Sequence, residues 1–442
     1  MSKRLILMLV LAFVVAITGA AYAEVQNVKV SGDITVSGLS RENFNLSQGV
    51  DGDKKEDHED IFMSQIRLRV DADLTDNVAA TLRLINERAW AQESNTNTDI
   101  DLDLAYVTLK EFLYSPLTLT VGRQEMRFGN GLIIGNGRNT GTTALNVPQD
   151  LSLRKAFDAI RATLDYDPLV LDVFYAKLEE NTGTQNDDVD LAGVNARYDV
   201  NANNSAEAYL FFRKDSNDAD VAATDKSDRV YTLGALLTNT AIENLKASIE
   251  GAYQFGHRRA AGGETDYKAW ALQPMLTYDI RGTKLDKYLP QVGLCYTYLS
   301  GNKVSDDSSR QLWNPMYYDQ ALNNITYAIL PFSNLQVINL KGKMKPADDV
   351  TLMANYGYYR LAKKVTSLTA PFANSDNTNY GSYTMKGDKD LGSALDLTAI
   401  YDYTEDVQLG LTAGMFFPGK AFDSPSGDGK AVQVIGSMKV TF

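Results

Sequence analysis

The stretch Ala431-Val432-Gln433-Val434-Ile435-Gly436-Ser437-Met438-Lys439-Val440-Thr441-Phe442 decides the fold class of this sequence. Side chains of an extended chain alternate between two faces, so every second residue points the same way. One face then carries Val432, Val434, Gly436, Met438, Val440 and Phe442, and the other carries Gln433, Ser437, Lys439 and Thr441. An alternating strand that ends on an outward aromatic residue is typical of the last strand of a transmembrane β-barrel.

The same alternation recurs along the whole chain and predicts one all-β domain. Apolar and polar residues alternate clearly near residues 66–72, 78–87, 192–199 and 338–344. We predict eighteen strands, near residues 27–41, 61–73, 78–91, 100–112, 117–125, 156–166, 169–180, 188–199, 204–214, 228–238, 243–255, 266–279, 287–300, 334–345, 348–360, 391–403, 406–418 and 430–442. Many are long enough to cross a bilayer at a tilt, which takes about 9–11 residues.

The connections between these strands alternate between short and long. Short connections fall at 74–77, 114–116, 167–168, 346–347 and 404–405, and long ones at 47–60, 126–155, 301–333 and 361–390. Short periplasmic turns that alternate with long outer loops are the pattern of outer-membrane barrels. A soluble β-sandwich also alternates its side chains, but it has no reason to sort its loops by parity. The sequence therefore predicts an antiparallel up-and-down barrel in the outer membrane.

The N-terminus reads as a secretory signal peptide. Lys3 and Arg4 precede an apolar run at residues 5–17, and Ala21-Tyr22-Ala23 is a small-x-small cleavage site. This combination predicts export through the Sec pathway, removal of residues 1–23, and a mature barrel domain at residues 24–442. The alternative is a retained anchor, for which the apolar run is short.

Composition excludes several classes of function. The chain has a formal net charge of −13, and loss of Lys3 and Arg4 makes it −15, which argues against nucleic-acid binding. One cysteine excludes a disulfide framework. The two histidines, His58 and His257, both fall in expected loops, which argues against a histidine-based catalytic or zinc site. We expect no cofactor, no metal and no enzyme activity. The acidic run at residues 51–57 lacks the spacing of a calcium loop and is expected to be solvated.

Tyrosines are frequent on the faces assigned to lipid. They are Tyr106, Tyr166, Tyr198, Tyr278, Tyr296, Tyr298 and Tyr401, several of them near predicted strand ends. Aromatic girdles mark both membrane interfaces of a transmembrane barrel. Tyrosine also has a high intrinsic strand propensity, which is the alternative reason for its abundance.

Charged residues on the opposite, lumen-facing phase are the candidate functional residues. The cations are Arg67, Arg69, Arg83, Arg161, Arg197, Lys246, Lys341 and Lys343, and the acids are Asp71, Glu87, Asp101, Asp103, Asp172, Glu250 and Asp396. The turn at 74–77 places Arg83 opposite Arg67 and Arg69, so three guanidinium groups gather on one wall. Two interpretations stay open: a track for a passing anion, and a network of ion pairs that only fills the lumen.

Three further motifs carry a family resemblance. Val121-Gly122-Arg123-Gln124 is followed by Phe128-Gly129-Asn130-Gly131-Leu132-Ile133-Ile134-Gly135 and then by Arg154-Lys155-Ala156-Phe157-Asp158-Ala159-Ile160-Arg161. This order resembles the alginate-export family of outer-membrane barrels. The resemblance implies an eighteen-stranded, monomeric channel whose basic lumen passes an acidic polysaccharide, with Arg123, Asp158 and Arg161 along the pore.

Alternation adds two qualifications to that resemblance. Arg161 faces the lumen by phase, whereas Arg123 and Asp158 share the phase of apolar neighbours, so they belong at the strand tops or at a bulge. The family's exporter is closed by two long loops, whereas the corresponding connections here, 93–99 and 404–405, are short. Any plug must therefore come from 126–155, 301–333 or 361–390.

These observations give one functional expectation and one alternative. We expect a passive outer-membrane channel for anionic polysaccharide or other anionic solutes, and the alternative is a general diffusion porin without such a preference. The expected partners are outer-membrane lipid, the transported anion and, during biogenesis, the barrel-assembly machinery.

Overall fold

The structure is a computed structural model of the 442-residue chain. It describes residues 27–46, 58–91, 100–136, 147–180, 188–216, 227–260, 263–302, 309–372, 380–423 and 429–442. The predicted signal peptide and the acidic run at 51–57 lie outside these residues.

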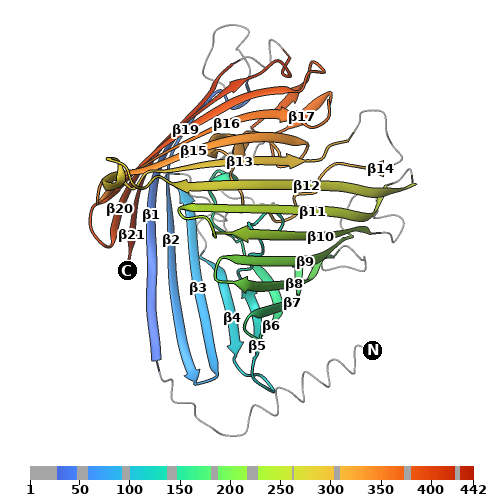
Figure 1. The fold of residues 1–442 in the computed structure, drawn as a ribbon, viewed down its shortest axis with the longest axis vertical. Helices are drawn as coiled ribbons and strands as arrows, with labels where there is room; N and C mark the ends of the chain where they lie inside the picture. Colours follow the sequence, from blue (N-terminus) through green and yellow to red (C-terminus); the bar gives the residue numbers. More distant parts are fainter. Residues whose placement is uncertain are drawn as a thin grey trace.

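The described chain is almost entirely β-structure (Figure 1). The strands of the barrel wall are β1 (Asn27–Glu42), β2 (His58–Thr75), β3 (Val78–Ala89), β4 (Asp101–Leu109), β5 (Leu117–Gln124), β6 (Phe157–Asp165), β7 (Leu169–Glu179), β8 (Val189–Asn201), β9 (Asn204–Asp215), β10 (Asp228–Asn239), β11 (Leu245–Ala260), β12 (Gly263–Asp279), β13 (Gln291–Leu299), β15 (Leu335–Ala347), β16 (Val350–Leu361), β19 (Asp390–Asp402), β20 (Val407–Pro418) and β21 (Ala431–Thr441). Smaller elements are η1 (Gln149–Leu151), η2 (Asp286–Tyr288), β14 (Ser309–Arg310), α2 (Asn324–Ile329), β17 (Ser367–Thr369) and β18 (Ser382–Thr384).

The eighteen wall strands form a closed antiparallel barrel. Each pairs with its neighbour in sequence, and β1 pairs with β21 from Asp33↔Thr441 to Glu42↔Val432, which closes the sheet. In Figure 1 the blue β1 and the red β21 lie side by side at this seam. The backbone of Phe442 exchanges two hydrogen bonds with Gly32, so the last residue is also part of the closure. All eighteen strands predicted from alternation are confirmed, most within two residues at each end.

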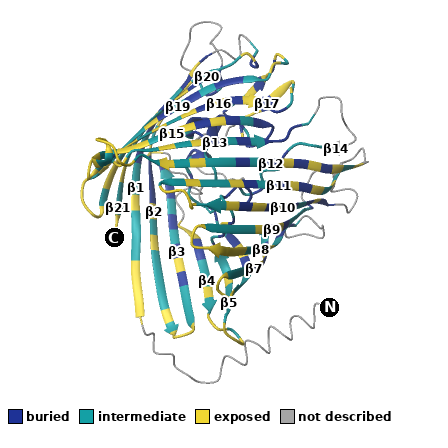
Figure 2. Ribbon diagram, in the orientation of Figure 1, coloured by how far each residue is buried: buried dark blue, intermediate teal, exposed yellow. Residues whose placement is uncertain are grey.

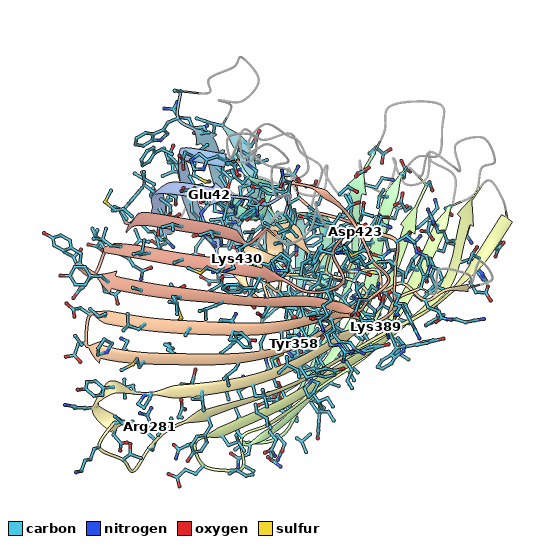
Figure 3. All side chains as sticks on the ribbon, turned by 90° about the horizontal axis from the view of Figure 1, so that it is seen from above. Glu42, Arg281, Tyr358, Lys389, Asp423 and Lys430 are labelled. Carbon is cyan, nitrogen blue, oxygen red and sulfur yellow. The ribbon has the colours of Figure 1, made fainter. Side chains whose placement is uncertain are left out.

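Burial alternates along the strands as the sequence predicts (Figure 2). In β2, Ile66 and Leu68 are each 41 % exposed on the outer face. Gln65, on the inner face of the same strand, is buried. In β15, Ile338 and Leu340 point outward and Asn339 is fully buried on the inner face. Figure 3 shows side chains on both faces of the wall, and it places Arg281 by a short turn, at the opposite strand ends from Lys389 and Asp423.

The outward assignment of Tyr106 is wrong. The β3–β4 register shifts between Arg83 and Leu84, so Asp103 is an extra residue in β4. Beyond this bulge Tyr106 is opposite Thr81, which faces the lumen and donates to Asp71. Tyr106 therefore faces the lumen, and Val107, which is 39 % exposed, faces outward in its place. A single inserted residue reverses the phase of everything that follows it.

A hydrophobic core fills part of the lumen. It combines inward residues of the wall, such as Phe174 and Phe211, with residues of three loops, such as Phe128, Ile325 and Tyr383. The loop residues of this core belong to the described parts of the connections 125–156, 300–334 and 362–389, the same three that the sequence identifies as possible plugs.

Candidate functional site

Residues 125–136, in the β5–β6 loop, enter the lumen and form the tip of a plug. Phe128 is 4 % exposed and packs on Phe174 and Phe211 of the inner wall, with ring centroids 5.3 and 5.4 Å apart. The next two backbone N–H groups each donate to a wall carboxylate, Gly129 to Glu207 at 2.8 Å and Asn130 to Glu250 at 2.9 Å. Two acids on neighbouring parts of the wall therefore hold the tip of this loop.

Gly129 allows this close approach. Its φ of +56° lies in the left-handed region, and a Cβ atom built on it would lie 2.4 Å from Glu250 Oε1. Any larger residue would have to push the carboxylate away and adopt an unfavourable backbone conformation. The glycine-rich motif thus serves to seat a loop against charged wall residues. Sequence reasoning assigned Glu250 to the lumen but did not identify it or Glu207 as plug contacts.

The β13–β15 loop, residues 300–334, lies against the plug tip. Its Tyr317 pairs with the β5–β6 loop through two backbone bonds of 2.9 Å, from Gly135 N to Tyr317 O and from Tyr317 N to Ile133 O. Arg127 reinforces the junction by an ion pair with Asp319 at 2.5 Å. The two loops therefore form one unit inside the barrel.

Asn323 anchors the β13–β15 loop to the opposite wall. It is fully buried, and its Nδ2 donates to Asp396 Oδ2 at 3.0 Å and to Asn355 O at 2.8 Å. The backbone N–H of Asn324, at the start of α2, donates to the same Asp396 oxygen at 2.6 Å. Asp396, which the sequence places in the lumen, is therefore committed to holding this loop.

A fourth contact, which sequence reasoning missed, joins two loops at the β1–β21 seam. Arg41 is 1 % exposed, and its Nη2 pairs with Asp150 of the β5–β6 loop at 2.6 Å. Its Nη1 also donates to the Tyr380 hydroxyl of the β16–β19 loop. Tyr380 in turn donates to Glu59 at 2.8 Å. Arg41 lies on the inward phase of β1, which was the available signal, but partners this distant in sequence cannot be read from alternation.

Lys155 is buried at the junction of the two plug loops. Its ammonium donates to the backbone oxygen of Tyr318 and lies 5.9 Å from the centre of that ring. Burial lowers the pKa of Lys155 to about 7, against the raising influence of Asp319 and with a further lowering by Arg127. A charge at this position therefore changes near neutral pH.

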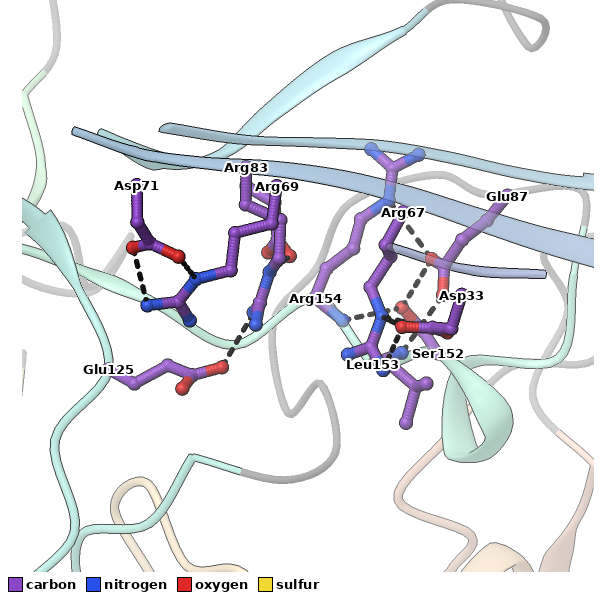
Figure 4. A network of polar contacts seen from close by, with 11 residues as sticks. Asp33, Arg67, Arg69, Asp71, Arg83, Glu87, Glu125, Ser152, Leu153 and Arg154 are labelled. Carbon is purple, nitrogen blue, oxygen red and sulfur yellow. Dashed lines mark hydrogen bonds and ion pairs between the residues drawn. The ribbon is translucent and has the colours of Figure 1, made fainter. Parts of the chain in front are cut away.

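The arginine wall predicted from the sequence is present, and each of its guanidinium groups is paired (Figure 4). Arg69 and Arg83 are direct partners across β2 and β3. Arg67 pairs with Asp33 at 2.9 Å, and Arg69 pairs with Asp71 at 2.7 Å. Arg83 contacts Asp103 at 2.5 Å and Glu125 at 2.6 Å. The geometry is that of an ion-pair network.

The remaining predicted arginines are also paired. Arg161 contacts Asp172 at 2.8 Å and lies 5.4 Å from the Phe128 ring, so it supports the plug tip from the wall. Arg197 contacts Asp199 at 3.3 Å. Arg123 and Asp158 pair with each other at 3.0 Å across β5 and β6, on the same face as the outward-facing pair Val121 and Ile160. The ion pair lies at the loop ends of the two strands, which is one of the two placements expected from the sequence.

The lumen lysines differ from the arginines. Lys341 and Lys343 lie two residues apart on the inner face of β15, and both side chains are exposed to the lumen. Lys246 of β11 lies in the same transverse row as Lys341, through Thr277 and Gly293. Among the residues that the structure describes, no carboxylate lies within 4.0 Å of any of these three ammonium groups.

Two cavities adjoin the plug. The larger, of about 840 Å³, is lined by Arg154, Lys155 and Arg213 together with Tyr317 and the acids of the neighbouring strands. The smaller, of about 290 Å³, lies between the β13–β15 loop and the wall and contains Lys341 and Lys343. The described lumen is therefore narrowed by protein rather than left as a wide pore.

Comparison with known proteins gives a family and a number of similar structures. A family model described as alginate export matches residues 31–431. The crystal structure of Pseudomonas aeruginosa OccK11 (OpdR) is similar, with a TM-score of 0.57 and 12 % identity over 95 % of this chain and 97 % of that one. Pseudomonas aeruginosa OpdQ has a TM-score of 0.54 and 14 % identity over 95 % and 100 % of the two chains. No curated protein sequence matches this chain.

Proposed function

Because this chain belongs to the alginate export family and folds as a closed barrel, we propose that it is an outer-membrane channel that favours anionic solutes, acidic polysaccharides among them. One observation supports the anion preference. Lys246, Lys341 and Lys343 reach the lumen without a carboxylate partner among the described residues, whereas every predicted arginine is paired. A paired guanidinium has little net electric field at the position of a passing ion, whereas an unpaired ammonium attracts a passing anion.

The plug supports a selective channel over an open pore. Loops from three places in the sequence contact the wall inside the barrel, and each contact uses specific buried groups such as Glu250, Asp396 and Arg41. A solute must pass the spaces beside these loops or displace them. This arrangement suits a channel that passes some solutes and holds back others.

Reversal potentials in a planar bilayer under a KCl gradient test the anion preference. We expect anion selectivity in the wild type and a clear loss of it in the triple variant Lys246→Gln, Lys341→Gln and Lys343→Gln. The matched control is the double variant Arg67→Gln and Asp33→Asn, which removes one cation and one anion together and should leave the reversal potential unchanged. Cation selectivity in the wild type would contradict the proposal.

The arginine wall supports the alternative function, a general diffusion porin. Because Arg67, Arg69 and Arg83 are neutralised by their partners, most of the lumen charge is balanced. Liposome swelling distinguishes the two functions. Entry rates that depend on solute size alone, with equal rates for neutral and anionic sugars of one size, favour the diffusion porin.

Biogenesis completes the proposal. Residues 1–23 are removed after Sec export, the barrel-assembly machinery inserts residues 24–442 into the bacterial outer membrane, and the channel works there as a monomer. Intact mass of the protein purified from outer membranes checks the first step, since the mature chain should begin at Glu24. A mass that includes residues 1–23 contradicts it.

A further inference from the structure

The smaller cavity has the composition of a binding site for a single anion. Its wall is formed by β12, β13, β15, β16 and β19, and its roof is Ala321 and Asn324 of the β13–β15 loop. Lys341 and Lys343 line it from one strand, with Gly342 between them. Gly293, the direct partner of Lys341 on the neighbouring strand, faces the same side and has no side chain. The space beside Lys341 is therefore left open by the sequence.

The charges around this cavity do not cancel. Asp396 is its one acidic lining residue in the described chain, and one of its oxygens already accepts bonds from Asn323 and Asn324. Two lysines thus face one carboxylate that is committed to the loop. Two like charges held close together on one strand repel each other, so an anion between them is stabilising.

Neutral polar groups complete the lining. Thr277, Gln291, Asn355 and Thr398 supply hydroxyl and amide groups. The last three already bond to Asp279, Leu322 and Thr412, and each keeps donor or acceptor capacity for the hydroxyls of a sugar. Sites for drug-sized ligands measure about 300–1,000 Å³. At about 290 Å³ this cavity is at the lower limit of that range, so it matches one sugar unit rather than an oligomer.

We propose that this cavity is a discrete binding site for one carboxylate-bearing sugar unit, held by Lys341 and Lys343 against the start of α2. This inference rests on the proposed function. It places the residues that bind the anion on β15 and not on the arginine wall. Lys341 and Lys343 lie in the half of β15 that leads to the short turn at residues 348–349. The site is therefore reached from the periplasmic side of the plug.

Single-channel recording with glucuronate tests this site, with glucose as the neutral probe of the same size. Glucuronate added on the periplasmic side should block the current in a saturable way, and glucose should not. The variant Lys341→Gln with Lys343→Gln should need at least about tenfold more glucuronate for the same block, which corresponds to about 1.4 kcal/mol. Lys341→Arg with Lys343→Arg keeps both charges and should retain block.

The outcomes separate the site from the function. An anion-selective reversal potential without saturable block, or equal block in the wild type and the glutamine variant, overturns the site and leaves the proposed function standing. Equal block by inorganic phosphate overturns the sugar assignment. A wild-type channel without anion selectivity overturns the proposed function itself. Folding of each variant is checked by the heat-dependent shift of the barrel in electrophoresis.

Discussion

At the scale of single residues, charge in this lumen is governed by pairing. Arg41, Arg83 and Arg154 are each held by more than one acceptor, and their partners come from different strands or loops. Leaving one partner of such a buried pair alone costs about 3–5 kcal/mol. These arginines therefore contribute to the position of the loops more than to the field in the lumen.

Lys155 gives the residue-scale prediction. Its pKa is lowered by burial to about 7 from 10.5, so the folded protein binds fewer protons than the unfolded chain between these two values. The contribution of Lys155 to stability must therefore rise as pH increases from about 7 to 10.5, and below about 7 the full penalty of the buried charge is present. Each pKa unit corresponds to about 1.4 kcal/mol, so the penalty is on the order of a few kcal/mol.

The variant Lys155→Met should remove this dependence. We expect a higher melting temperature than the wild type at pH 6 and a smaller difference at pH 10, measured by circular dichroism in detergent. Lys287→Met, at an exposed turn, is the matched control and should show the same melting temperature as the wild type at both pH values. A difference between Lys155→Met and the wild type that does not change with pH would contradict the assignment.

At the scale of elements, the strands could be predicted from the sequence and the plug contacts could not. Strand alternation depends on neighbours two residues away, and the sequence displays it directly. The bulge at Asp103 has no such local signal, and it reversed the assignment of Tyr106. The ion pair of Arg41 with Asp150 joins residues 109 positions apart, through a loop with no regular period. Alternation placed the lumen arginines correctly, but it could not show which acids pair with them.

Gly129 gives the element-scale prediction, because it seats the plug tip. Gly129→Ala should cost about 1–3 kcal/mol from backbone strain alone, and its Cβ would also overlap Glu250. We expect the tip to leave the wall, so that single-channel conductance rises and fluctuates. Gly282→Ala is the control, since Gly282 has a φ of +74° but no atom within 4 Å of an added Cβ. It should keep wild-type conductance, and unchanged conductance in Gly129→Ala would exclude this role for the tip.

At the scale of the whole molecule, the barrel has two apolar regions, one on each side of its wall. The outer one faces lipid and includes exposed residues such as Leu340 and Leu397. The inner one is the core that the plug loops form with the inward aromatic residues of the wall. The mean hydropathy of −0.25 averages over both and over the charged lumen and loops. Outward positions of the wall must therefore stay apolar to face lipid, whereas inward positions can carry polar and charged side chains.

Adjacent positions in the middle of β19 test that separation. Leu397 is 51 % exposed on the lipid face, and Thr398 faces the lumen, where it bonds to Thr412. Leu397→Lys puts a charge in the hydrocarbon layer, at a cost of about 2–4 kcal/mol near the midplane. Thr398→Lys adds the same charge to the wet side and loses one hydroxyl contact, worth about 1 kcal/mol. Guanidinium unfolding in lipid vesicles should therefore show a much larger loss of stability for Leu397→Lys. Because the two sites share one strand and one depth, equal losses would mean that the face assigned to lipid is not in contact with it.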